Sequence, residues 1–139
     1  MQNARHCALI TIGDEGQPQA RVVDPLLPDS ELAVWIGTNP LTRKVGQIRR
    51  DARVTLFYFD PTGPGYVTLL GTAELVNSPR EKARHWKDEW APIYKGGRGG
   101  DDFLLIRVKP RRLEIVSYKA GFVGDPKTWL PIAIDIPQK

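Results

Sequence analysis

Apolar residues alternate with polar ones, or gather in short blocks, along most of this chain, and turn-forming residues separate the blocks. Alternation with a period of two is typical of half-buried strands, and short apolar blocks between turns are typical of buried ones. Gly71 interrupts the longest block and predicts a bulge or bend, as barrels need at their corners. The predicted strands cover residues 8–12, 19–24, 31–36, 53–59, 66–76, 103–108 and 112–117.

Turn residues and a capping motif complete the predicted architecture. Gly13-Asp14-Glu15-Gly16 predicts a hairpin between the first two strands, and Lys109-Pro110-Arg111 predicts one between the last two. Ser78-Pro79-Arg80-Glu81 is a capping box, which predicts a helix from Pro79 to about Trp90. The tail from Lys119 is too irregular to assign.

The number and order of these elements predict a fold class. Six or seven strands at short spacing, with two short helices and no strand–helix–strand alternation, favour a mainly β (α+β) fold, an antiparallel barrel with helical plugs. Without a repeat or a linker, residues 1–139 are expected to form a single domain. No apolar run approaches the roughly 20 residues of a membrane span, and no signal-peptide pattern is present, so the cytoplasm is the expected location.

The strand ending at Ile36 leads into Gly37-Thr38-Asn39-Pro40 and a second predicted helix. Asn39 suits an N-cap and Pro40 suits the first helical position. The apolar residues of this helix, Leu41, Val45 and Ile48, would then share one face.

The first turn of this helix carries Thr42, Arg43 and Lys44. Cations at a helix N-terminus oppose the helix dipole unless an anion lies among them. Free N–H groups, a hydroxyl and two cations together would suit a bound phosphate. A solvated basic face is the other interpretation, since Arg49, Arg50 and Arg53 follow, and the local pattern does not decide between them.

The net charge and the reactive side chains limit which partners and which kinds of site the sequence favours. The formal net charge of +4 is a small excess, which does not by itself indicate a polyanion partner. Cys7 is the single cysteine and is expected to be a buried hydrophobe, and His6 and His85 lack a second ligand at metal spacing. A phosphate site without an obvious acid, base or nucleophile favours chemistry supplied by a cofactor.

Four motifs resemble those of the pyridoxamine 5'-phosphate oxidase-like split-barrel flavoproteins, and the general-stress-protein branch in particular. The motifs lie between Gly16 and Ala73 in the family's order, the resemblance as a whole covers nearly the whole chain, and the Thr-x3-Thr-Arg-Lys spacing is its most specific part. The motifs are Gly16-x-Pro18-x-Ala20-Arg21-Val22-Val23, Trp35-Ile36-x-Thr38-x3-Thr42-Arg43-Lys44, Ile48-Arg49-x-Asp51-x-Arg53-Val54-x-Leu56-x-Phe59, and Tyr66-Val67-x-Leu69-x-Gly71-x-Ala73.

This resemblance implies a six-stranded split barrel that forms a homodimer, with FMN in two symmetric clefts between the subunits. It implies hydride transfer through the flavin N5, in an oxidoreductase whose substrate is a small molecule. Its implied cofactor-binding residues are Arg43, Lys44 and Arg21 at the phosphate, Val22, Val23 and Thr38 along the ring and ribityl chain, and Thr42 as a hydroxyl donor. Further candidates for the cofactor site are Gly37, Tyr66 and Trp129, of which Trp129 could cover the flavin or pack within the tail.

Two departures from the family pattern argue against vitamin B6 as the substrate. Tyr66 stands where the vitamin B6 oxidases have a glutamine, and the Arg-x-His motif that holds a substrate phosphate is absent. The aromatic side chains of Trp35, Tyr66 and Trp129 instead suggest a flat apolar partner, such as a nicotinamide or a quinone.

Three other functions are open on the residues alone. A related split barrel could use the deazaflavin cofactor F420 or haem, and the chain could store or sense a flavin without turnover. A small basic barrel could also stack single-stranded nucleic acid on Tyr58, Phe59 and Tyr66. The cations gather at one helix start and are not spread along strands, so a nucleic-acid partner is not expected.

Overall fold

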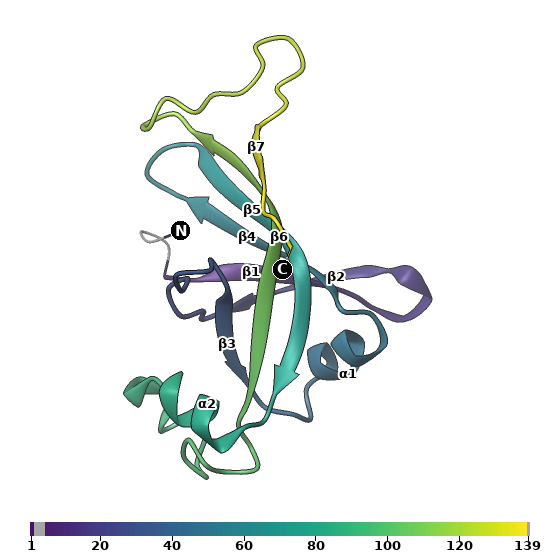
Figure 1. The fold of residues 1–139 in the computed structure, drawn as a ribbon, viewed down its shortest axis with the longest axis vertical. Coiled ribbons are helices and arrows are strands. Elements are labelled where there is room, and N and C mark those ends of the chain that lie inside the picture. Colours follow the sequence, from purple (N-terminus) through teal and green to yellow (C-terminus); the bar gives the residue numbers. More distant parts are fainter. Residues whose placement is uncertain (2–4, 139) are drawn as a thin grey trace.

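The computed structural model describes residues 1 and 5–138, which form one twisted antiparallel sheet with two helices beside it (Figure 1). The strand order is β2-β1-β4-β5-β6-β3, and β7 pairs with the remaining length of β6. The predicted mainly β architecture, with seven strands and two short helices, is therefore confirmed. The elements are β1 (Cys7–Ile12), β2 (Pro18–Val23), β3 (Val34–Thr38), α1 (Arg43–Arg50), β4 (Arg53–Asp60), β5 (Gly65–Val76), α2 (Pro79–Arg84), β6 (Leu104–Ser117) and β7 (Ile132–Asp135), with short 3₁₀ turns at Asp14–Gly16 and Asp88–Trp90.

One bridge brings the two ends of the sheet together. Pro25, just after β2, pairs with Ile36 of β3, and the Leu26 N–H donates to the Trp35 carbonyl at 2.9 Å. Strands β2 and β3 otherwise remain separate edges. The sheet thus curls into a barrel that is open along one seam.

The predicted hairpin at Lys109-Pro110-Arg111 is wrong, because β6 runs through it without a turn. The register against β5 shifts between Leu70 and Gly71, which face Arg112 and Pro110, so Arg111 is the extra residue of a bulge. A bulge is a place where a strand tolerates proline, since proline cannot donate to the ladder. The bulge predicted at Gly71 is confirmed.

Replacing Gly71 with alanine should be costly. A Cβ at this position would lie 2.1 Å from the Lys109 carbonyl oxygen, a backbone atom fixed by the sheet. We expect Gly71→Ala to lower the free energy of unfolding by about 1–3 kcal/mol or more, which is the usual cost of overpacking. Urea denaturation measures this change.

Gly46 provides the matched control, because a Cβ there meets nothing within 4 Å on an exposed helical face. Gly46→Ala should stabilise the protein by about 0.4–1 kcal/mol. Equal small effects at the two glycines would contradict the bulge assignment.

Two apolar clusters form, one on each face of β3. Val34 and Ile36 belong to the barrel interior, and Trp35 packs outward with Trp90 and Phe103 beside α2. The predicted strand 31–36 is displaced, because Leu32 adopts a φ of 63° in the turn before β3. α1 lies against β1 and β5 and contributes Val45 and Ile48 to the buried set.

The helix predicted from Pro79 to about Trp90 ends at Arg84. Ser78 caps it as expected, accepting a hydrogen bond from the Glu81 N–H at 3.4 Å. His85 leaves helical geometry, and a 3₁₀ turn then carries Trp90 to its buried position.

Residues 118–135, here called the C-terminal arm, follow β6, and the loop before β7 extends beyond the ends of β5 and β6 (Figure 1). The arm was not assigned from the sequence, and it returns as β7, which pairs with β6 from Arg112 to Ile115. All four side chains of β7 are exposed. None of the helices in the described part of the chain is long and apolar enough to cross a membrane.

Candidate functional site

α1 begins at Arg43, three residues later than an N-cap at Asn39 predicts. Asn39 instead accepts a hydrogen bond from the Leu41 N–H at 2.8 Å, so its side chain closes the turn before the helix. Leu41, predicted on the apolar helix face, is 93% exposed in that turn. Val45 and Ile48 are buried as predicted.

Thr42 is the N-cap of α1, but its side chain does not cap the helix. Its hydroxyl donates to the Asn39 carbonyl at 2.8 Å and lies 3.2 Å from the buried Thr38 hydroxyl. The backbone N–H groups of Arg43 and Lys44 donate to no acceptor among the described residues. The first turn of α1 therefore has free donors that an anion could satisfy.

Arg21 reaches this region from β2, on the face it shares with Val23 as predicted. The β1–β2 register sets Arg21 opposite Leu9 and Gln19 opposite Thr11. One guanidinium nitrogen, Nη1, donates to the Thr11 hydroxyl at 2.7 Å, and the other, Nη2, donates to the Gln47 Oε1 at 3.1 Å.

Three cations thus share one environment. Burial lowers the pKa of Lys44, and the nearby Arg21 charge lowers it further. Burial likewise lowers the pKa of Arg21, with a second contribution from Arg43. No carboxylate pairs with any of the three among residues 1 and 5–138. A bound anion would relieve this repulsion.

Of the three cations, Lys44 lines an open hollow of about 330 Å³ between β2, the end of β3 and α1, and Arg21 and Arg43 are not among its lining residues. This volume is at the small end of the range of about 300–1,000 Å³ for ligand pockets. Apolar side chains share its wall, among them Val22, which is 73% exposed. The lining residues are Val22, Val23, Asp24, Gly37, Thr38, Asn39, Thr42, Lys44, Trp90, Ile93 and Tyr94.

Gly37 has a packing reason to be glycine. A Cβ at this position would lie 2.8 Å from Trp90 and 2.9 Å from Phe103. The aromatic cluster therefore presses against the β3 backbone at the edge of the hollow.

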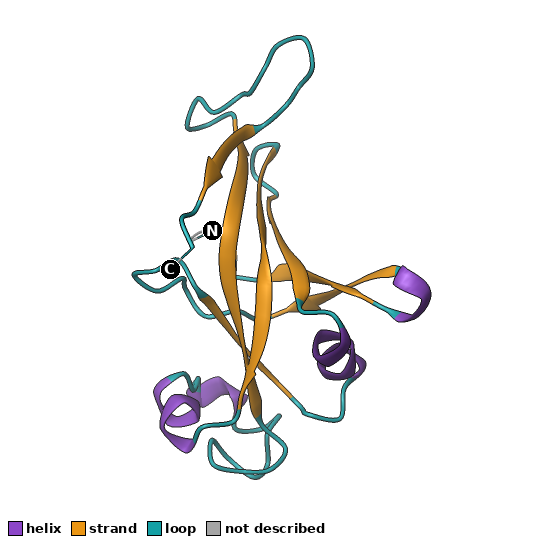
Figure 2. Cartoon of the chain, turned by 45° about the vertical axis from the view of Figure 1, so that its right-hand side comes forward, coloured by secondary structure: helices purple, strands orange, loops and turns teal. Residues whose placement is uncertain are grey.

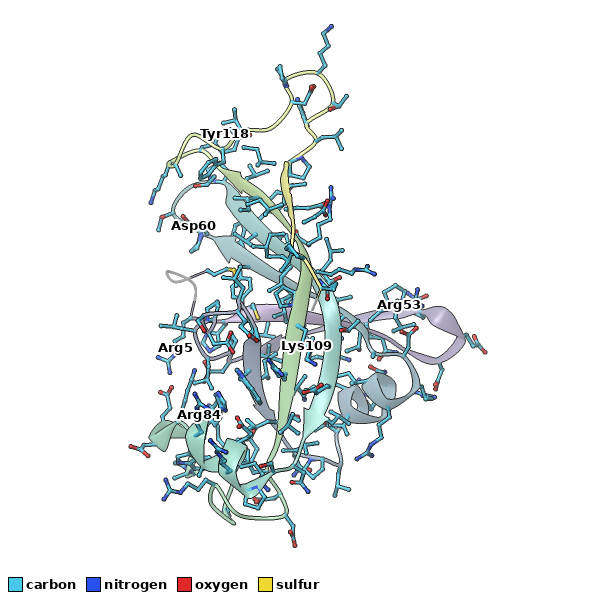
Figure 3. All side chains as sticks on the ribbon, viewed as in Figure 1. Arg5, Arg53, Asp60, Arg84, Lys109 and Tyr118 are labelled. Atoms are coloured by element: carbon cyan, nitrogen blue, oxygen red, sulfur yellow. The ribbon has the colours of Figure 1, made fainter. Side chains whose placement is uncertain are left out.

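Two predicted site residues, Tyr66 and Trp129, lie elsewhere in the chain. Tyr66 pairs with Phe59 near the end of β4 and lines a different hollow with Val116 and Ser117. Trp129 is 82% exposed on the C-terminal arm. Asp60, Tyr118 and the arm lie at one end of the molecule, away from α1 (Figure 2; Figure 3).

Cys7 and His85, two of the reactive side chains considered from the sequence, have structural roles. Burial raises the pKa of the Cys7 thiol to about 12, as expected of a buried hydrophobe. His85 stacks on Trp35 with ring centroids 3.8 Å apart, and its Nδ1 lies 3.3 Å from the Glu81 carboxylate. In the part of the chain that the structure describes, no three His, Cys, Asp or Glu side chains are grouped to hold a metal.

The polar residues behind Arg21 were not predicted from the sequence. Gln47 and Thr11 are 4% and 0% exposed, and Gln47 donates from Nε2 to the Gln19 Oε1 at 2.8 Å. Strand alternation offered a sign, because Thr11 shares the buried face of β1 with Cys7 and Leu9.

The family profile described as pyridoxamine 5'-phosphate oxidase matches residues 1–117. No curated protein sequence gives a significant match.

Solved structures with a similar fold come from several bacteria. A Clostridium acetobutylicum protein related to general stress protein 26 superposes with a TM-score of 0.81 at 19% identity, covering 97% of this chain and 88% of its own. General stress protein 26 of Bacillus anthracis gives 0.76 at 13% identity, covering 96% and 91%. A conserved hypothetical protein of Mycobacterium tuberculosis gives 0.70 at 24% identity, covering 84% and 79%. At these identities the likeness shows the fold, the split barrel.

Proposed function

Because the chain belongs to the pyridoxamine 5'-phosphate oxidase family, we propose that it binds FMN and acts as an FMN-dependent oxidoreductase on a small substrate. The observation that carries the proposal is the cation group, Arg21, Arg43 and Lys44, at a helix start without a capping side chain or a paired carboxylate. This donor set suits a phosphate monoester better than a neutral ligand.

The residues present fit FMN in two respects. Lys44, Arg43 and the first N–H groups of α1 would hold the phosphate, with Arg21 beside them. Val22, Ile93 and Tyr94 offer apolar surface along the same hollow for the ring system. When bound, FMN supplies hydride chemistry at N5, which no side chain of the chain provides. The protein supplies the position and the charge.

The active form is a homodimer, with each cofactor lying between two chains. The hollow is open and small, so one chain alone would leave much of the flavin in water. Apolar exposure on the C-terminal arm supports a partner chain, because such concentrations on a protein surface mark interfaces. The exposed apolar residues of the arm are Tyr118, Phe122, Val123, Trp129, Leu130, Ile132 and Ile134.

The substrate is a flat electron donor or acceptor and not pyridoxamine phosphate. A substrate phosphate would need its own cations, and those beside the hollow already serve the cofactor. The chain also lacks the Arg-x-His motif that would bind a second phosphate.

Anaerobic mixing tests the activity. The protein loaded with FMN should lose its visible flavin absorption when a reduced nicotinamide or a reduced deazaflavin is added, and pyridoxamine phosphate should leave it unchanged. Bleaching by pyridoxamine phosphate alone, with formation of the aldehyde, would contradict the proposed substrate class. Protein that stays colourless and does not quench added FMN at micromolar concentration would contradict the proposal itself.

A further inference from the structure

Gln47 lies on the buried face of α1 and points its amide at Arg21. Arginine only donates, so the atom that faces it must be the amide oxygen. The same Oε1 also accepts from the Thr11 hydroxyl at 2.6 Å. Since the Thr11 oxygen accepts from Arg21, its proton is directed to Gln47, and the three groups form a closed, oriented set.

These contacts use only part of the guanidinium. Nη1 donates to the Thr11 hydroxyl and to the carbonyls of Leu9 and Gln19, at 2.7, 3.2 and 3.3 Å. Nη2 donates one hydrogen bond, to Gln47, and Nε has no acceptor in the described part of the chain. Of the five N–H donors of an arginine, about two remain for a ligand.

All the acceptors around Arg21 are neutral. Arg21 is partly buried, and an arginine shielded from water commonly pairs with a carboxylate, because an uncompensated charge there is costly. Here an amide, a hydroxyl and two carbonyls fix the side chain and leave its positive charge uncancelled. A site that must attract an anion gains from this arrangement, since a carboxylate at position 47 would compete with that anion.

We propose that Gln47 is a positioning residue, whose neutral amide holds Arg21 in place while keeping its charge available to the phosphate of FMN. This inference rests on the proposed function and assigns it a residue outside the hollow. Because the role depends on charge as well as geometry, Gln47→Glu should weaken FMN binding more than Gln47→Met. A purely structural role predicts the opposite order, since Gln47→Glu keeps the hydrogen-bond acceptor.

Gln47→Glu keeps the size of the side chain and the acceptor for Arg21 and Thr11, but it cancels the charge. We expect it to weaken FMN binding by about 10- to 150-fold, the range for the loss of one charge-assisted hydrogen bond, measured by flavin fluorescence titration. Riboflavin, which lacks the phosphate, should bind the variant and the wild type alike. The unfolding temperature should stay the same or rise, because the new carboxylate pairs with Arg21.

Gln47→Met removes the acceptor but leaves the charge. It should lower the unfolding temperature, because Thr11 and Arg21 lose a buried partner, and should weaken FMN binding less than Gln47→Glu does. Gln17→Glu is the matched charge control, since Gln17 is exposed in the turn between β1 and β2. It should leave both affinities unchanged.

Two failures can be told apart. If wild type binds FMN more tightly than riboflavin but Gln47→Glu weakens both equally, or neither, the role of Gln47 is wrong and the proposed function stands. If wild type does not bind FMN, the proposed function is wrong and the role of Gln47 is overturned with it.

Discussion

Replacing both Arg43 and Lys44 with alanine is expected to weaken FMN binding at least about 100-fold, since each charge-assisted bond to phosphate contributes about 1.5–3 kcal/mol. The two residues open α1, where the helix lacks a side-chain cap and where Lys44 is half-buried next to Arg21. Riboflavin affinity should be nearly unaffected. Isothermal titration with the two flavins measures both quantities.

Arg50→Ala is the control for this variant. Arg50 lies on the same helix, but its guanidinium pairs with Asp14 in the turn before β2. Loss of this exposed pair should change FMN affinity little. Equal losses of FMN and riboflavin in the Arg43 and Lys44 variant would show that the substitutions damage the fold and do not remove a phosphate contact.

Changing Trp129 and Leu130 to glutamate should shift the dissociation constant of the dimer at least about 100-fold toward monomer. Burial of a large apolar side chain contributes about 1.5–3 kcal/mol, and these two side chains are exposed on the C-terminal arm. They contribute nothing to the buried clusters of their own chain, so the fold should be kept. Light scattering should report about twice 15.6 kDa for wild type and a lower mass for the variant.

Lys127→Glu tests whether a charge on the arm suffices to separate the chains. Lys127 is exposed on the same arm and makes no ion pair within the described part of the chain. The dimer should persist in this variant, because no apolar surface is lost. A wild-type chain that is monomeric at micromolar concentration and still holds FMN would contradict the dimeric site.

The strands whose apolar and polar residues alternate were predictable from the sequence. The strands β1, β2, β4 and β5 lie within about one or two residues of their predicted positions, because each presents one apolar face to the core. The continuous strand β6 was not predicted, because residues such as Pro110 are typical of both turns and bulges. Only the pairing with β5 shows that Pro110 lies at a bulge. The start of α1 was misplaced for a similar reason, since Asn39 caps turns as well as helices.

The candidate site was predictable where its chemistry is local. Thr42, Arg43 and Lys44 follow one another, so their meeting at a helix start needed no knowledge of the fold. The contact of Gln47 with Thr11 and Arg21 became visible only in three dimensions, because Gln47 and Thr11 are 36 residues apart in the sequence. Tyr66 and Trp129 lie away from the hollow in one chain, and their proposed cofactor-binding roles stay predictions.

The relative affinity of the wild-type protein for FMN and riboflavin tests the central claim most directly. The two ligands share the ring and the ribityl chain and differ by the phosphate, so their ratio isolates the group that Arg21, Arg43 and Lys44 are proposed to hold. We expect FMN to bind at least about 100-fold more tightly, the equivalent of about 2.8 kcal/mol, with the difference shrinking as salt is added. Equal affinities for the two flavins would contradict the proposed phosphate site.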